Sequence, residues 1–401
     1  MTTMQPPKLK NYDVVIIGGA MLGSSTAWFL SNNRDFTGKI LVVERDPTYE
    51  FAATSLTNSS IRQQFSEPIN VKISQFGADF VKNFKTYMGG DPDLPQPIIQ
   101  SFGYMYLANT QRFADQLKAD QKMQAANGAG TKHMSRDEIK AAYPFYQLDD
   151  IIAGNHNLID EGYFEGATLF DWWKRKAKQN GVEYLHNEVV AIFHNANRVE
   201  TVTLTTGEII TCGTIVNCSG TRASLIAAMI DIKIPVEPRK RMTFIFDAEK
   251  PLDRNLPLTI DPSGIHMRTE GKYYMTGGPP DDDQAVDHND FDIDHGIWEN
   301  KIWPAVANRI PQFESIKVIN CWAGHYDYNV LDQNAILGPH TEIRNFMFCN
   351  GFSGHGFQQS PAMGRGVSEL IIYGEFRTLN LSPFSFGRIE RNEPFVEKAV
   401  I

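Results

Sequence analysis

Six residues near the N-terminus, Gly18 to Gly23, have the spacing of a dinucleotide-binding turn, G-x-G-x-x-G, with Ala20 in place of the middle glycine. In such a turn the first glycine makes the bend, the second lets the backbone approach a pyrophosphate, and the third packs the helix on the strand. We therefore expect a helix start at Ala20, Met21 and Leu22 whose N–H groups face a pyrophosphate. The alternative is a plain strand–helix turn.

An acidic residue supports the dinucleotide reading. Glu44 ends the next apolar run, "KILVVE", where a carboxylate accepts a hydrogen bond from a ribose 2′-OH. The same charge repels a 2′-phosphate, which argues against NADP.

The elements around this turn predict an α/β fold. Residues 12–45 indicate a strand–turn–helix–strand unit, and "VETVTLTTGEIITCGTIVN" indicates a β-hairpin that turns at Thr206 and Gly207. Near the C-terminus, strand "NFMFCNG" leads through "FSGHG" into a helix. Alternating strands and helices at both ends and a β-rich middle predict a discontinuous nucleotide domain with an interleaved substrate domain.

Composition limits the partners and the location. The 401 residues carry a net charge of −9 without a basic block, so we expect no nucleic-acid partner. The four cysteines lack metal-like C-x-x-C spacing, and so few cysteines in a chain of this size are typical of a reducing compartment. The first 13 residues lack the apolar core of a signal peptide, and no apolar run has the ~20 residues that a bilayer requires. We expect a cytoplasmic protein with no transmembrane segment.

Three further segments, "SSIRQQFSEPIN", "VNCSGTRAS" and the block from "CWAGHYDYN" to "GFSGHGFQQSPAMGRGVSELI", resemble the D-amino-acid oxidase superfamily. Within it they are similar to the branch of mitochondrial FAD-dependent oxidoreductase domain proteins and to bacterial sarcosine, glycine and iminodiacetate oxidases. The resemblance implies FAD, bound non-covalently, in a Rossmann-like domain of the glutathione-reductase type. It implies that residues 1–90, 151–235 and 323–401 bind FAD, and that residues 91–150 and 236–322 bind a substrate.

The resemblance also implies roles for residues along the FAD. The ADP half would lie against Gly18, Gly23, Glu44 and Arg45, with the adenine against Val189 and the pyrophosphate near Ser219 and Gly220. The ribityl chain would lie beside Ser59 and Ser60. The pyrimidine edge of the flavin would lie at Gly354, His355, Gly356 and Phe357. A helix N-terminus after this last turn would stabilise negative charge on reduced flavin.

Four residues are candidates for the substrate end. Arg62 matches a carboxylate-binding arginine of the sarcosine-oxidase branch, and a planar guanidinium suits a carboxylate; the alternative is a surface arginine in a salt bridge. Arg268 is a second candidate clamp. Tyr326 would pack or hydrogen-bond beside the substrate, and His355 lies in the flavin turn.

Other polar residues have plainer interpretations. His266 fits either the cavity lining or the core, Trp172 and Trp173 fit the core, and the acidic segment 281–295 fits a solvated loop, so no metal is expected. His325 lies near the position of the covalent flavin link in sarcosine oxidase. Met275 matches the position of a lysine that activates oxygen in that branch, which leaves the electron acceptor open.

The resulting hypothesis is FAD-dependent oxidation of the C–N bond of a secondary or N-substituted amino acid, such as sarcosine, an imino acid or an iminodiacetate-like acid. The acceptor is O2 or an electron carrier. Three alternatives stay open: a dehydrogenase that reduces a quinone or carrier protein, a flavoprotein that acts as an assembly or binding factor, and an NAD-linked dehydrogenase.

Overall fold

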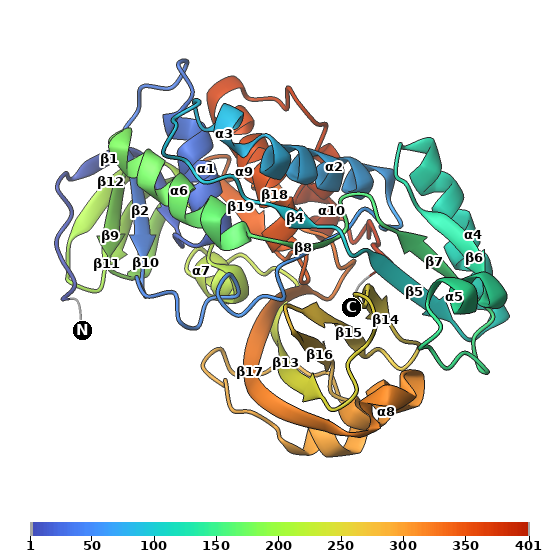
Figure 1. Ribbon diagram of the computed structural model, residues 1–401. Helices are drawn as coiled ribbons and strands as arrows, with labels where there is room; N and C mark the ends of the chain where they lie inside the picture. Colours follow the sequence, from blue (N-terminus) through green and yellow to red (C-terminus); the bar gives the residue numbers. More distant parts are fainter. Residues whose placement is uncertain (1–2, 400–401) are drawn as a thin grey trace.

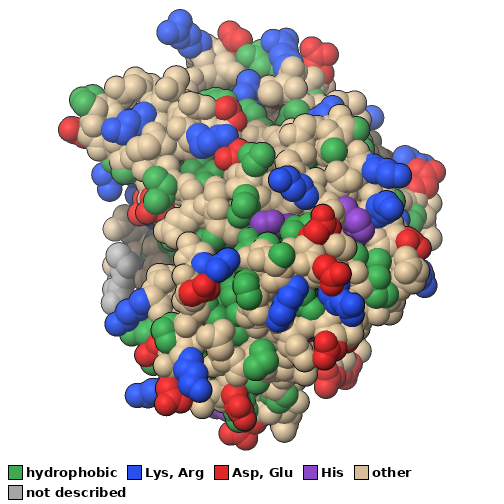
Figure 2. Space-filling model, turned by 45° about the vertical axis from the view of Figure 1, so that its right-hand side comes forward, with side chains coloured by type: hydrophobic (Ala, Val, Ile, Leu, Met, Phe, Trp, Pro, Cys, Tyr) green, Lys and Arg blue, Asp and Glu red, His purple; other side chains and the backbone are tan. Residues whose placement is uncertain are grey.

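The computed structural model describes residues 3–399. It contains two large β-sheets and one three-stranded sheet (Figure 1). Helices cover the first large sheet, so the fold is mixed α/β as predicted. No helix in this described part of the chain has the length and apolar character that a membrane crossing requires. On the face in Figure 2, Lys and Arg side chains are intermingled with Asp and Glu side chains.

The first sheet contains the predicted nucleotide-binding strands. β12, β1, β2 and β9 run parallel in that order, and β19 pairs in parallel with the C-terminal part of β12. Residues Val14 to Ile17 of β1 are all buried, as expected for a parallel strand covered on both faces. The bounds are β1 (Asn11–Ile17), β2 (Ile40–Glu44), β9 (Glu183–His186), β10 (Val189–Asn195), β11 (Arg198–Leu204), β12 (Ile209–Asn217), β18 (Ile336–Pro339) and β19 (Phe346–Asn350).

Four helices pack together over the first sheet. α1 (Met21–Ser31) contacts α6 (Gly166–Gln179) and α9 (Gly356–Tyr373), and α9 also contacts α2 (Pro68–Lys82). Ser25 Oγ donates a hydrogen bond to the Ser360 carbonyl at 2.7 Å, so α1 and α9 approach closely. Trp28 and the fully buried Trp173 belong to this core, as predicted for Trp173.

The second sheet has the order β17-β13-β16-β15-β14-β5-β7-β6, and long strands β13 and β17 pair along their length. Its bounds are β5 (Tyr104–Ala108), β6 (Lys132–Ser135), β7 (Ala153–Asn157), β13 (Val236–Ala248), β14 (Leu258–Ile260), β15 (His266–Glu270), β16 (Tyr273–Gly278) and β17 (Ile316–Asn329). The third sheet joins β3 (Ser60–Ile61), β8 (Gly162–Phe164) and β4 (Ile99–Gln100). The remaining helices are α3 (Phe84–Tyr87), α4 (Gln111–Ala126), α5 (Arg136–Ala142), α7 (Ala223–Ala228), α8 (Trp303–Arg309) and α10 (Gly387–Glu390).

The strands divide between the sheets differently from the predicted domain ranges at two places. β7 lies in the second sheet, although the range 151–235 groups it with the FAD-binding strands. All of β17 lies in the second sheet as well, although residues from 323 onward were grouped with the first. The domain boundaries themselves stay predictions.

Candidate active site

The glycine turn closes tightly between β1 and α1. Gly18 has φ +96°, and a Cβ there would lie 2.5 Å from the Cys218 carbonyl oxygen. A Cβ on Gly23 would lie far inside contact distance of the Gly18 carbonyl oxygen. Ala20, in contrast, is the N-cap residue of α1 and lines a cavity. The turn therefore needs glycine at its first and third positions and tolerates the methyl group of Ala20.

Glu44 is held rigidly at the end of β2. Its carboxylate oxygens accept the N–H groups of Gly19 and Asp46, both at 2.8 Å, and burial raises its pKa. The Glu44 side chain lines the same cavity as Ala20. Glu44 thus lies beside the glycine turn, and its role toward a ribose stays a prediction.

One connected cavity of about 260 Å³ runs from the glycine turn to the second sheet. Sixteen of the predicted site residues line it: Gly18, Ala20, Met21, Leu22, Glu44, Arg45, Ser60, Arg62, Val189, Ser219, Gly220, Tyr326, Gly354, His355, Gly356 and Phe357. Segments from seven separate parts of the chain thus meet around one cavity, and their roles toward FAD stay predictions.

Three predicted residues do not line this cavity. Gly23 acts in helix packing, and Ser59, at φ +51°, accepts the Phe164 N–H on its carbonyl. Arg268 forms an ion pair with Glu270 at 2.5 Å and donates to the carbonyls of Thr269 and Asn58. The structure therefore brings Arg62, but not Arg268, into the cavity wall.

Arg62 lines the cavity and is 1 % exposed, so the surface salt-bridge interpretation is wrong. Its Nη1 donates to the Gln64 carbonyl at 2.6 Å, and its Nη2 donates to His355 Nε2 at 2.7 Å and to the Ala399 carbonyl. The guanidinium carbon lies 4.2 Å from the centre of the Phe65 ring. Within residues 3–399 no carboxylate pairs with this buried cation.

The buried carboxylate of Glu161 supports the segment that contains Arg62. The antiparallel pair Ile61–Gly162 places Glu161 beside it. The carboxylate of Glu161 accepts the Gln63 N–H at 2.7 Å and the side-chain amides of Gln64 and Asn157 at 2.8 Å. Burial raises the pKa of Glu161 to about 7. The sequence interpretation missed this residue.

The Glu161 proton gives stability a predictable pH dependence. Between the ordinary pKa of 4.5 and the folded value of about 7, the native protein holds a proton that the unfolded chain releases. The unfolding free energy therefore falls as pH rises through this window, by about 3 kcal/mol in total from this group. Glu161→Gln should remove that dependence, and Gln64 Oε1, which is buried without a partner, can accept the new amide. Denaturant unfolding at pH 5 and 7.5 checks this, and equal pH slopes for wild type and variant would refute it.

The turn before α9 is fixed by the half-buried carboxylate of Asp327. Asp327 accepts the N–H groups of Gly351 at 2.8 Å and Phe352 at 3.1 Å, and burial raises its pKa to about 6. Gly354 has φ +88°, and a Cβ there would lie 2.7 Å from the Tyr326 ring. α9 begins two residues later, and its N-cap, His355, makes no side-chain cap bond. The N-terminus of a long helix therefore opens on the cavity.

Polar residues of the second sheet complete the cavity wall. Asn58 Nδ2 lies 2.8 Å from His266 Nε2, and Thr243 Oγ1 donates to Asn58 Oδ1 at 3.3 Å. Burial, aided by Arg268 and Arg241, lowers the pKa of His266 to about 4, so this ring is neutral at pH 7. His266 thus lines the cavity rather than only filling the core.

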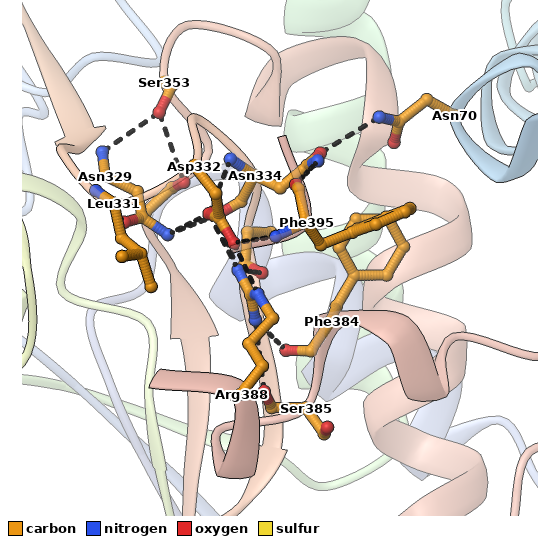
Figure 3. A network of polar contacts seen from close by, with 12 residues as sticks. Asn70, Asn329, Leu331, Asp332, Asn334, Ser353, Phe384, Ser385, Arg388 and Phe395 are labelled. Carbon is orange, nitrogen blue, oxygen red and sulfur yellow. Dashed lines mark hydrogen bonds and ion pairs between the residues drawn. The ribbon is translucent and has the colours of Figure 1, made fainter. Parts of the chain in front are cut away.

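The segment 393–399 crosses beside the site and is anchored by two buried carboxylates. Glu397 accepts hydrogen bonds from Ser66 N–H at 2.8 Å and Asn70 Nδ2 at 2.8 Å. Asp332 accepts the Phe395 N–H at 3.0 Å and pairs with Arg388, as Figure 3 shows. These contacts bring the Ala399 carbonyl to Arg62.

Comparison with known proteins identifies the family. Residues 13–370 match the DAO family, described as FAD dependent oxidoreductase. The chain belongs to this family. It is 36 % identical to FAD-dependent oxidoreductase domain-containing protein 1 of Xenopus laevis, across 97 % of this chain and 85 % of that protein. It is 23 % identical to sarcosine oxidase subunit beta of Arthrobacter sp, across 96 % and 93 %.

Solved structures agree with the family assignment. L-proline dehydrogenase from P. horikoshii has a TM-score of 0.83 and 25 % identity, and covers 96 % of this chain and 99 % of its own. Iminodiacetate oxidase from Chelativorans sp. BNC1 shares the fold, with a TM-score of 0.74 and 18 % identity across 94 % and 98 %.

FAD is the cofactor of this DAO-family oxidoreductase. The cavity fits it, because the glycine turn leaves the α1 N-terminus open beside Glu44, and the α9 N-terminus opens at the other end. The NAD-linked alternative is therefore wrong.

Proposed function

We propose that this DAO-family protein oxidises the C–N bond of a secondary or N-substituted amino acid. The observation that carries the proposal is Arg62, a buried guanidinium without a carboxylate partner among residues 3–399, in the wall of the FAD cavity. A buried cation of this kind is suited to an anionic ligand, and an amino-acid carboxylate matches its planar donors.

The residues that would hold FAD are those of the glycine turn, Glu44, Val189 and the turn 354–357. Bound FAD supplies an acceptor for a hydride from the substrate α-carbon. The resulting imine is hydrolysed by water to an amine and an oxoacid or aldehyde. We propose non-covalent binding, since Nε2 of His325 is engaged at 2.7 Å by the Asp290 carbonyl.

The residues of the chain bind and orient the substrate. Both Nη2 hydrogens of Arg62 are used, by His355 and by the Ala399 carbonyl, so a carboxylate binds Nη2 when one of these partners gives way. We propose that the Ala399 carbonyl is the one replaced. The neutral ring of His266 and the half-buried Tyr326 then complete a cavity from which water is displaced.

Arg62→Met tests this role. The variant should weaken binding of (methylthio)acetate, a non-oxidisable monocarboxylate, by about 2–5 kcal/mol, because a buried charge pair is lost. Flavin absorbance titration of FAD-loaded protein measures the dissociation constant. Arg268→Met is the matched control, since Arg268 is equally buried but lies outside the cavity. The affinity of this control variant for (methylthio)acetate should stay within about threefold of the wild-type value. An unchanged constant in Arg62→Met would remove Arg62 from the substrate site.

We propose that the electron acceptor is either O2 or an electron carrier such as a quinone or carrier protein. Met275, on β16, is buried and brings no charge to the position where the sarcosine-oxidase branch has a lysine. Peroxide formation in air distinguishes the two acceptors. We also propose a cytoplasmic location, which the small number of cysteines, four in 401 residues, favours.

A further inference from the structure

Arg241 is a second arginine in the FAD cavity, and the sequence interpretation overlooked it. It lies on β13 opposite Gly324 of β17, lines the cavity and is 8 % exposed. Its guanidinium carbon is 5.1 Å from the centre of the Tyr326 ring, and that ring lies against Gly354 of the flavin turn. Arg241 therefore lies beside the part of the cavity where the proposed chemistry occurs.

The hydrogen bonds of Arg241 leave one edge of its guanidinium free. Asp283 accepts from Nη1 at 2.6 Å and from Nη2 at 2.8 Å, and the Lys240 carbonyl accepts from Nη1 at 3.1 Å. Nε is buried without a partner in residues 3–399. Since Nη2 carries two hydrogens, Nε and Nη2 still offer a side-on pair of donors. A carboxylate that reaches this edge would bind it side-on and leave the Asp283 contacts in place.

The donors left unused around the substrate end fit two carboxylates. Arg62 has no carboxylate partner among the described residues, and Arg241, although its charge is balanced by Asp283, keeps Nε and one Nη2 hydrogen unused. A ligand with one carboxylate would satisfy Arg62 and leave the Nε edge of Arg241 unpaired. A ligand with two carboxylates would satisfy both arginines.

We propose that Arg241 binds a second carboxylate, so that the site selects N-substituted amino acids with a carboxylate on each side of the amine. This inference rests on the proposed function and names its substrate class. Arg241 is then a residue that determines specificity, and Asp283, on the loop between β16 and α8, positions its guanidinium.

The test compares two ligands that differ by one carboxylate. Thiodiacetate and (methylthio)acetate carry sulfur in place of the amine, so both bind without being oxidised. Titration of FAD-loaded protein, followed by flavin absorbance, gives their dissociation constants. Wild type should bind thiodiacetate at least about tenfold more tightly, as expected for one bidentate charge-assisted contact.

Two variants separate a specific role of Arg241 in ligand preference from a general effect of removing an arginine from β13. Arg241→Met should abolish the preference for thiodiacetate and keep the (methylthio)acetate constant within about threefold. Arg239→Met is the matched control: Arg239 lies two residues away on β13, pairs with Glu237 at 2.9 Å and does not line the cavity. It should keep the preference.

The binding results separate a failure of the dicarboxylate inference from a failure of the proposed function. If wild type binds both ligands equally, or if Arg241→Met weakens both equally, the dicarboxylate inference is overturned while the amino-acid site stands. If wild type loaded with FAD binds neither ligand, the proposed function fails together with this inference.

Discussion

Replacing Gly23 with alanine is expected to abolish stoichiometric FAD binding. The new Cβ would collide with the Gly18 carbonyl oxygen. The backbone that holds both atoms is fixed between β1 and α1. Because no flexible side chain can move aside, the turn must open, and the α1 N-terminus moves away from the pyrophosphate. We expect at least a hundredfold weaker FAD binding, or about 3 kcal/mol, measured by fluorescence titration of apoprotein.

Ala20→Gly is the matched control for Gly23→Ala. Ala20 is three residues away in the same turn, and its methyl group lines the cavity. Glycine is tolerated at an N-cap, so FAD affinity should stay within about threefold. If Gly23→Ala binds FAD as tightly as Ala20→Gly does, the phosphate-binding role of this turn is wrong.

The second large effect is expected from Arg388→Met. Asp332 is fully buried, and Arg388 Nε and Nη2 contact its carboxylate at 2.7 and 3.1 Å (Figure 3). Removing one partner of a buried ion pair leaves an uncompensated charge, at a cost of about 3–5 kcal/mol in unfolding free energy. Chemical denaturation measures the loss. The double variant Asp332→Asn/Arg388→Met removes both charges and should recover part of the stability.

This ion pair also bears on the substrate site. Asp332 holds the backbone at Phe395, four residues before the Ala399 carbonyl that contacts Arg62. Loss of the pair should therefore free the segment 393–399 as well as destabilise the fold. A loss below about 1 kcal/mol would show that the network contributes little.

Local patterns predicted the nucleotide-binding part of the fold well. The apolar run before Gly18 is β1, and the hairpin turns at Thr206 and Gly207 between β11 and β12, as expected. The placement of β7 and β17 was not predictable, because each strand joins its sheet through long-range pairing with β5 or β13. Alternation along a strand does not specify its partner.

Some residues of the candidate site are likewise predictable from local sequence, whereas others gain their roles only through tertiary contacts. Gly18 and Gly354 are recognisable because a positive φ and a close backbone approach require glycine. Arg241 was missed because it ends the basic run "RKR", which has the composition of a solvated strand. Glu161 gains its role only by contact with Gln63 and Gln64, almost 100 residues earlier in the chain. Burial and partner, which no local pattern encodes, distinguish such residues.

Amine oxidation by the bound flavin can be followed by anaerobic titration of the FAD-loaded protein with secondary amino acids. Sarcosine or iminodiacetate should bleach the flavin absorbance, with iminodiacetate effective at the lower concentration, and Arg62→Met should require much more of either. Correctly folded protein whose flavin no amino or imino acid reduces would refute the proposed oxidation and favour a role in assembly or binding.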